Sequence, residues 1–234
     1  MSISSKLNYI KETKNIFADV LIEKGETVDK NDTFRSYAYK FASIKTPEKI
    51  APTTLTFSEY AGTELDLSFI DTSRMTSFGN LFNKCENLKS LDVSHFNTQN
   101  VTAMQMTFAR CNSLEEVKGL ENWKTPKLTN ISYMFNTCSK IKKVDFSSFD
   151  STNITSSTET FNNCSNLVAL IINNPNVFNM PNVNMLAGNP IKYGTGYIYV
   201  PDDLVETYKS ATNWSTYADQ IKGISELPND EEEE

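Results

Sequence analysis

The sequence predicts an α/β repeat fold, in which a coil of about 26 residues with one short parallel strand and one short helix is stacked at least four times. Two observations predict it. Four cysteines, Cys85, Cys111, Cys138 and Cys164, are separated by 26, 27 and 26 residues, and the same residue types recur at fixed distances from each. A unit of this length cannot bury its own apolar edge, so the units are expected to stack as a solenoid.

The residues around each cysteine form columns. Three residues before each cysteine stands Phe, and nine before stands Thr, whereas the third and sixth residues after it are aliphatic. These columns are Phe82, Phe108, Phe135 and Phe161; Thr76, Thr102, Thr129 and Thr155; Leu88, Leu114, Ile141 and Leu167; and Leu91, Val117, Val144 and Leu170.

Each unit has a strand part and a helix part. Alternation over residues 88–93 predicts a short strand, which would pair with the equivalent strand of the next coil at a spacing of about 4.8 Å. Thr102 is placed to cap a short helix, because Met104, Phe108 and Cys111 follow at helical spacing. The strands and helices should therefore occupy opposite sides of the stack.

The third unit contains one extra residue and Pro126 in place of the usual turn. Trp123 takes the position held by Ile70, Phe96 and Phe149 in the other units. This column favours a buried Trp123 over a binding hot spot.

The segments LDVSHFNTQNVTAMQMTFARCNSL and CSKIKKVDFSSFDSTNITSSTETFNNCSNL resemble the BspA-like leucine-rich repeats of bacterial surface proteins. The resemblance covers about residues 55–190, and it implies a leucine-rich-repeat solenoid with a non-catalytic interaction role. Three features depart from the pattern: the extra residue before Trp123, Ser157 where an apolar residue is usual, and the Asn/Pro-rich stretch after Ile172.

The chain ends differ from the repeats. Residues 1–45 carry an apolar stripe at helical spacing and resemble the short helical modules ahead of variable domains in phage and prophage structural proteins, which implies attachment or oligomerisation. We expect a linker and N-terminal cap at 46–64, the solenoid at 65–190, a C-terminal cap at 191–227 and a solvated acidic tail at 228–234. The tail could instead bind a basic partner or a cation.

The C-terminal cap resembles the terminal cap that often follows such repeats. Its expected parts are a final strand at 197–201, a helix capped by Asp202 or Asp203, and a second short helix carrying Trp214, Tyr217 and Ile221.

Composition excludes several function classes. Net charge is −7, with five of the 29 acidic residues in the last five positions, so a basic face for nucleic acid is not expected. Mean hydropathy is −0.41 and no run of about 20 apolar residues occurs, so membrane insertion is not expected. The N-terminus lacks the apolar region of a secretory signal.

Catalytic and metal-binding patterns are missing from the sequence. No nucleophile, phosphate-binding, zinc-protease or dinucleotide motif occurs, and His95 is the single histidine. We therefore expect no catalytic residue, no metal, no cofactor and no enzymatic activity. His95 is expected to be an exposed turn residue rather than a site residue, and the cysteines to be buried free thiols rather than metal ligands or disulfides.

The variable strand positions predict a binding face. The candidate binding residues are Lys89, Asp92, Ser94, Glu116, Lys118, Lys143, Asp145 and Ser147. Such a mixed-charge surface suits many weak polar contacts with protein or carbohydrate, although variation there is also what an unconstrained surface would give.

The leading hypothesis is a phage or prophage virion-associated protein. Its N-terminal helices would bind other virion proteins, with homo-oligomerisation as a further role, and its solenoid would bind a host surface protein or carbohydrate. The alternatives are a bacterial cell-surface adhesin of the same repeat family and a structural decoration protein without ligand.

Overall fold

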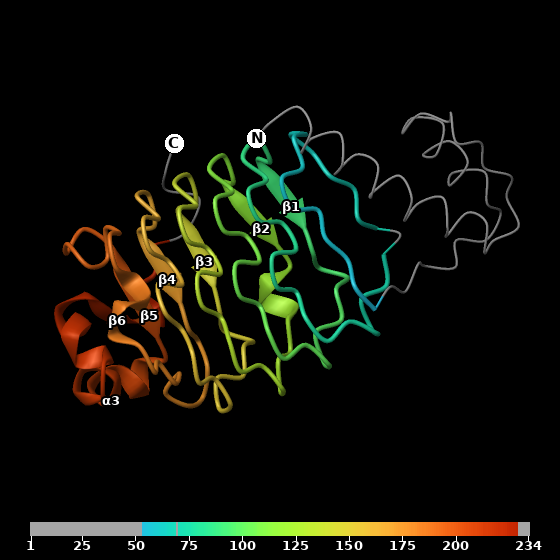
Figure 1. Cartoon of the computed structure of the whole chain (residues 1–234). Coiled ribbons are helices and arrows are strands. Elements are labelled where there is room, and N and C mark those ends of the chain that lie inside the picture. Colours follow the sequence, from blue (N-terminus) through green and yellow to red (C-terminus); the bar gives the residue numbers. More distant parts are fainter. Residues whose placement is uncertain (1–52, 69, 229–234) are drawn as a thin grey trace, which may run out of the picture. The chain divides into compact units, whose positions relative to one another are not determined.

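The computed structural model describes residues 53–68 and 70–228. In this part the chain runs through successive windings, and strands β1 to β6 follow one another in sequence order (Figure 1). The expected N-terminal helices at 1–45, the start of the linker and most of the acidic tail lie outside the described residues.

The strands form two sheets, with orders β1-β2 and β3-β4-β5-β6. The strands are β1 (Ser90–Asp92), β2 (Glu116–Lys118), β3 (Lys143–Asp145), β4 (Ala169–Ile171), β5 (Tyr197–Val200) and β6 (Ile221–Gly223). The helices are η1 (Leu120–Asn122), η2 (Val183–Leu186), η3 (Asp202–Leu204), α3 (Val205–Ser210), η4 (Trp214–Gln220) and η5 (Ile224–Glu226).

The register of the strands follows the repeat. All strand pairs are parallel, and Leu91 lies opposite Val117 while Val144 lies opposite Leu170. Each of these partners occupies the position six residues after its cysteine. On the other side of the windings, Ser77, Ala103, Asn130 and Ser156 join in a chain of parallel bridges. One repeat therefore corresponds to one winding.

The core contains a continuous stack of phenylalanines. Ring centroids are 5.7 Å apart between Phe57 and Phe82, 5.5 Å between Phe82 and Phe108, 4.9 Å between Phe108 and Phe135, and 5.5 Å between Phe135 and Phe161. The column of repeated phenylalanines is thus extended by Phe57 from the chain before the first cysteine. Such offset stacking adds to the free energy gained by burying the rings.

Trp123 belongs to a second aromatic column, which confirms that it is a core residue. Its centroid lies 6.3 Å from that of Phe96 and 6.1 Å from that of Phe149, and its side chain is fully buried. The indole Nε1–H donates to the Val93 carbonyl at 3.2 Å. The extra residue of the third unit is absorbed near η1 without loss of this column.

The short helix expected between threonine and cysteine in each coil is absent, because residues 102–111 and the equivalent segments of the other windings form consecutive turns instead. The amide of Leu81 donates to the Phe78 carbonyl and that of Cys85 to the Phe82 carbonyl, as in β-turns. In between, the amide of Phe82 donates to the Thr107 carbonyl of the next winding at 2.8 Å. Every second amide thus donates a hydrogen bond to the next winding, whereas in a helix the amides would donate to carbonyls of the same segment.

The expected helix cap at Thr102 is also wrong. Its hydroxyl donates to the Thr76 carbonyl at 3.1 Å, and the hydroxyl of Thr129 donates to the Thr102 carbonyl at 2.9 Å. Thr155 repeats the contact with Thr129 at 3.2 Å. The threonine column therefore joins windings rather than starting helices.

The turns place non-glycine residues in the left-handed region. Two columns are affected: Asn80, Met106, Tyr133 and Glu159, and Lys84, Arg110, Thr137 and Asn163. The third residue of such turns needs positive φ, which is unfavourable for residues with a Cβ. The hydrogen bonds between windings and the buried rings offset this strain.

The C-terminal elements differ from expectation in three places. β5 is followed by β6, so it is not the final strand, and Ile221 belongs to β6 instead of a helix. Neither Asp202 nor Asp203 caps a helix through its side chain. The Asp202 carboxylate accepts hydrogen bonds from the amide and the hydroxyl of Ser225 at 3.2 and 2.8 Å.

Buried aromatic side chains attach this C-terminal part to the preceding chain. Trp214 Nε1–H donates to the Phe178 carbonyl at 2.7 Å, and the Tyr217 hydroxyl donates to the Val183 carbonyl at 2.6 Å. The Tyr208 hydroxyl accepts from the Phe178 amide at 2.8 Å. The amide and carbonyl of Phe178 and the carbonyl of Val183 therefore have side-chain partners on α3 and η4.

Replacing Trp123 with Ala should lower the free energy of unfolding by about 3–5 kcal/mol, because it leaves a cavity in the aromatic column. Trp123→Phe is the matched control and should lose less, since Phe96 and Phe149 fill the same position in adjacent windings. Urea denaturation followed by circular dichroism measures both. Equal losses would contradict the packing role of the column.

Thr137→Asn should raise the free energy of unfolding by about 0.5–1 kcal/mol, because Asn tolerates positive φ better than a β-branched residue. Thr137 has φ 62°, and Asn163 holds the same position one winding later with φ 58°. Thr158→Asn serves as the control, because Thr158 is not among the positive-φ residues. A destabilised Thr137→Asn variant would show that this turn is not strained.

Candidate functional site

The outer strand face is the set of side chains on β1 to β6 that point away from the core. In β1 the central Leu91 is buried, so Ser90 and Asp92 point outward. The parallel register then places Glu116 beside Ser90 and Lys118 beside Asp92. The equivalent outward residues of β3 are Lys143 and Asp145.

The structure divides the eight candidate binding residues into two groups. On the outer strand face lie Asp92, Glu116, Lys118, Lys143 and Asp145, and at the strand ends lie Lys89, Ser94 and Ser147. Six of them are exposed, whereas Asp145 and Ser147 are half-buried. The face brings together residues from three windings, and their role in binding stays a prediction.

Local hydrogen bonds fix the acidic groups. The Asp92 carboxylate accepts from the hydroxyl of Ser94 at 2.6 Å and from its amide at 2.9 Å. These bonds, the hydroxyl first, lower the pKa of Asp92 below its ordinary value, so the group is charged at neutral pH. Asp145 accepts from the Ser147 amide at 2.7 Å, and the Ser147 hydroxyl accepts from the Asn173 amide at 3.0 Å.

Lys118 forms only a weak ion pair on this face. Lys118 Nζ lies 3.5 Å from Glu116 Oε2, and both side chains are 58% exposed. An ion pair this exposed contributes about 0–1 kcal/mol and is weakened by salt. The two side chains are therefore able to rearrange toward a partner.

The outer strand face changes character at β4, which the repeat pattern does not predict. Beside Lys143 and Asp145 the register places Ala169 and Ile171, and beside these Tyr197 and Tyr199. Ala169, Ile171 and Tyr199 are buried, with Tyr197, Ile224 and Leu227 packed against them. Ile224 of η5 and Leu227, which follows η5, thus cover this half of the outer strand face.

Polar contacts tie the covering segment to the strands. Lys222 Nζ lies 3.9 Å from the centre of the Tyr197 ring and 3.8 Å from Glu226 Oε2. The Gly223 amide donates to Glu226 Oε1 at 3.3 Å. The sequence signal that could have identified this apolar half is the alternation Tyr197–Ile198–Tyr199, which places two aromatic rings on the outward side of β5.

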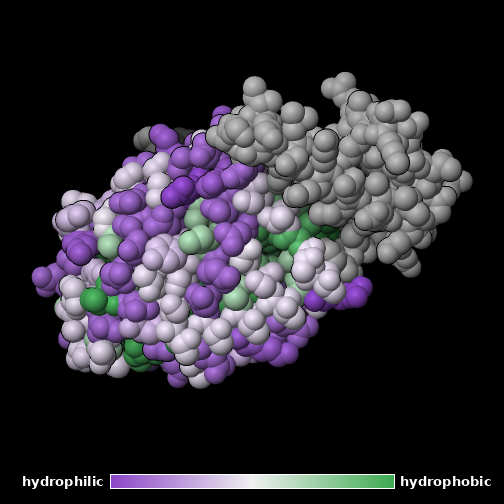
Figure 2. All heavy atoms as spheres, in the orientation of Figure 1, coloured by the Kyte–Doolittle hydropathy of each residue, from purple (hydrophilic) through white to green (hydrophobic). Residues whose placement is uncertain are grey.

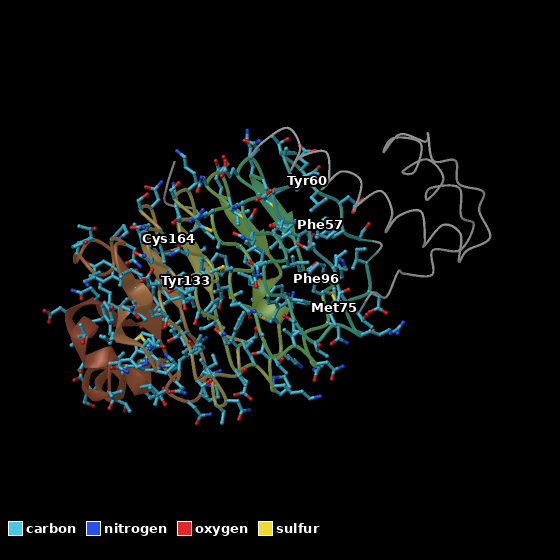
Figure 3. All side chains as sticks on the ribbon, in the orientation of Figure 1. Phe57, Tyr60, Met75, Phe96, Tyr133 and Cys164 are labelled. Atoms are coloured by element: carbon cyan, nitrogen blue, oxygen red, sulfur yellow. The ribbon has the colours of Figure 1, made fainter. Side chains whose placement is uncertain are left out.

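The four cysteines are buried free thiols, as expected. Each Sγ–H donates to the phenylalanine carbonyl of the preceding winding, from Cys85 to Phe57 at 3.2 Å, Cys111 to Phe82 at 3.1 Å, Cys138 to Phe108 at 3.0 Å and Cys164 to Phe135 at 3.0 Å. Phe57 and Cys164 lie toward opposite ends of this column (Figure 3).

Asn189 ends the thiol column. Its side chain is 1% exposed, and Nδ2 donates to the Phe161 carbonyl at 3.4 Å, as a cysteine does in the earlier windings. The column therefore adds a second hydrogen bond to a carbonyl that already accepts a turn amide, and its role is structural.

The other candidate groups do not form a site. His95 is half-buried rather than exposed, because its Nε2 lies 2.7 Å from the Leu67 carbonyl and its ring packs edge-on against Phe96. In residues 53–68 and 70–228, no group of three or more His, Cys, Asp and Glu side chains could hold a metal ion. The helices of the same ranges are all too short or too polar to cross a bilayer.

The visible surface is dominated by hydrophilic residues, with small, separate hydrophobic areas (Figure 2). Among the described residues, the large hydrophobic side chains that are exposed are Met106, Val168, Val183 and Tyr193. Polar contacts are therefore the main means of recognition that the outer strand face offers.

Comparison with known proteins gives one family. A family model described as "Mycoplasma protein of unknown function, DUF285" matches residues 53–174. This range contains all four cysteine windings and all eight candidate binding residues. No curated protein gives a significant match to the chain.

Stability should fall as pH rises from about 9 to 12, because the folded state favours the protonated thiols. Burial raises the pKa of Cys164 to about 12, above the value of about 8.5 for a thiol in an unfolded chain. The stabilisation is complete below the unfolded pKa and is lost as pH rises through the folded pKa.

Urea denaturation of the wild type and of Cys164→Ala between pH 8 and pH 11 measures this effect. The variant should be less stable at pH 8 but should lose stability less steeply with rising pH. Burial also raises the pKa of Tyr208 to about 12, so part of the slope will remain. Identical slopes in both proteins would contradict the assignment to Cys164.

Proposed function

This chain belongs to the family described as Mycoplasma protein of unknown function, DUF285, and from that premise we propose that it is a non-enzymatic binding protein displayed on a surface. The matched range contains the four cysteine windings and the charged part of the outer strand face on β1 to β3, so the family domain is the part that would bind. The observation that carries the proposal is the placement of charged, exposed residues on one rigid face formed by three windings.

The proposal includes a fold assignment, in which the windings form a BspA-like leucine-rich-repeat solenoid. In-register parallel strands and continuous core columns support it. The turns between Thr102 and Cys111 differ from the helical side that we expected from the sequence, so the support comes from the strand side. A rigid stack suits display, because neighbouring windings hold the outward residues in fixed relative positions.

The proposed partner is a host surface protein or carbohydrate. Asp92, Glu116, Lys118 and Lys143 offer both donors and acceptors to a polar ligand. The apolar half of the face is covered by Ile224 and Leu227, so it is not proposed as the contact surface.

We propose the virion of a phage or prophage as the setting, with residues 1–45 joining the protein to other virion components. The bacterial name in the family description supports the alternative, a cell-surface adhesin. A decoration protein without ligand is the third candidate. Immunogold electron microscopy of phage particles and of producing cells separates the first two settings, and a protein found only inside cells would contradict both.

The triple variant Asp92→Ala, Glu116→Ala and Lys118→Ala should lower binding of the labelled full chain to host cells by at least about tenfold, since it removes one acceptor from β1 and both charges of β2. Flow cytometry at a range of protein concentrations gives the apparent Kd. The matched control, Glu86→Ala, Lys124→Ala and Asp219→Ala, also removes two acids and one lysine, all exposed and outside β1 to β3, and should leave the Kd unchanged.

Circular dichroism and urea denaturation should show that both triple variants fold like the wild type. If the strand-face variant binds cells as tightly as the control does, the outer strand face is not the binding surface. If the wild type binds no host cell, the decoration protein becomes the better account.

A further inference from the structure

The covering residues Ile224 and Leu227 lead the chain back across the outer strand face. They follow β6 and pack against the outward side chains of β4 and β5, among which Ile171 and Tyr199 are buried. The sheet has the order β3-β4-β5-β6, and these strands lie side by side (Figure 1). The next strand in the direction of the covering residues is therefore β3.

The residues that come next in the sequence are strongly acidic. Only Asn229 separates Pro228 from the acidic segment, residues 230–234, whose sequence DEEEE carries five negative charges. An extended residue advances a chain by about 3.3–3.6 Å, whereas adjacent strands lie about 4.8 Å apart. The acidic segment is therefore long enough to reach β3 from the position of Leu227 on the covered strands.

The chain at the start of β3 carries the densest group of positive charges in the described residues. The basic segment, residues 140–143, has the sequence KIKK, in which all three lysines are exposed. Lys143 is an outward residue of β3, and it already interacts within its own chain. Its register partner on β4 is Ala169, which belongs to the cluster beneath the covering residues. The basic segment therefore lies directly beside the covered half of the outer strand face.

We propose that the acidic segment binds the basic segment of the same chain, through ion pairs between its carboxylates and Lys142 and Lys143. This contact continues the cover from the apolar half of the outer strand face onto β3, and it differs from the solvated tail that the sequence predicts. The acidic segment then competes with an external ligand for Lys143. The competition rests on the proposed function, because it regulates the same face.

Charge complementarity favours the basic segment over the lysine of β6. Lys222 Nζ already lies 3.8 Å from Glu226 Oε2, so a further carboxylate at that place is repelled by the first. Lys140 and Lys142, in contrast, have no acidic partner in the described part of the chain. The acidic segment therefore gains most at the basic segment, where three positive charges stand together.

The covalent connection makes a set of weak ion pairs sufficient. Exposed pairs contribute little individually, and they are screened within a Debye length of about 8 Å at physiological ionic strength. A short linker, however, gives two segments of one chain an effective concentration in the mM range. The contact should therefore form at low ionic strength and yield to salt or to a ligand that binds the face more tightly.

Zero-length carbodiimide cross-linking of the full chain, read by mass spectrometry, tests the contact. At low salt and about 1 µM protein, where weak contacts between chains are rare, the acidic segment should be joined to Lys142 or Lys143. The pair Lys84–Glu59, with Nζ 2.9 Å from Oε1, should also be joined and is the internal positive control.

Two double variants separate this contact from random encounters. Lys142→Gln with Lys143→Gln should lower the total yield of cross-links from the acidic segment at least about threefold, because two of its three partners lose their charge. Lys124→Gln with Lys127→Gln removes two exposed lysines elsewhere and should leave the yield unchanged. Circular dichroism checks that both variants fold.

The inference is overturned if Lys84–Glu59 is cross-linked while the acidic segment is joined to no lysine. It is also overturned if the acidic segment is joined equally to distant exposed lysines such as Lys124 and Lys192.

Cell binding by a neutral variant tests the competition. The neutral variant carries Asp230→Asn, Glu231→Gln, Glu232→Gln, Glu233→Gln and Glu234→Gln. The control changes the net charge equally at exposed acids elsewhere and carries Asp219→Asn, Glu64→Gln, Glu86→Gln, Glu121→Gln and Glu206→Gln. In flow cytometry at low salt, the neutral variant should bind host cells at least about threefold more tightly than the control does. An equal Kd would contradict the competition.

The two experiments keep the inference and the proposed function apart. If the acidic segment is cross-linked to the basic segment but the wild type binds no host cell, the contact stands and the proposed function fails. If the cross-links are absent while the strand-face variant loses cell binding, the proposed function stands and the inference fails.

Discussion

The structure depends on the hydrogen bonds between windings. In the segment between threonine and cysteine, every second amide donates to a carbonyl of the winding that follows. The amides of Phe82, Phe108 and Phe135 each donate to a carbonyl of the next winding at 2.8 Å. These bonds require every winding to have nearly the same length, because one added residue shifts the donors that follow it. The insertion near Trp123 is accommodated at η1, after β2 and before the next turns, so the ladder resumes in register.

The same constraint explains the irregular backbone. Amides that bond between windings cannot also bond within a helix, so the segments between threonine and cysteine form turns whose third residue has positive φ. The strain is repeated in every winding and is offset by the aromatic columns and by the thiol and threonine hydrogen bonds. The cysteine column therefore has a structural basis, because each thiol gives the phenylalanine carbonyl of the preceding winding a second hydrogen bond, beside the one from the turn amide.

A rigid interior leaves the outward positions as the variable part of the molecule. On β1 to β3 these positions carry charges, and on β4 and β5 they carry apolar and aromatic residues beneath η5. The outer strand face thus has an open, charged half and a closed, apolar half. The family match covers the open half in full, while the covering segment lies beyond residue 174. Binding by the family domain would thus use the charged half.

The sequence alone determined the repeat length, the core columns and the strand register, since each winding repeats the same side chains and Leu91 must meet Val117 one repeat later. It also identified Trp123 and the thiols as core, because their columns contain only residues that bury well. Only the tertiary structure decided that turns replace helices, because spacings of three and four fit both and the choice depends on bonds to another winding. It likewise decided that Tyr199 and Ile171 are covered, since the residues that cover them, Ile224 and Leu227, are distant in sequence.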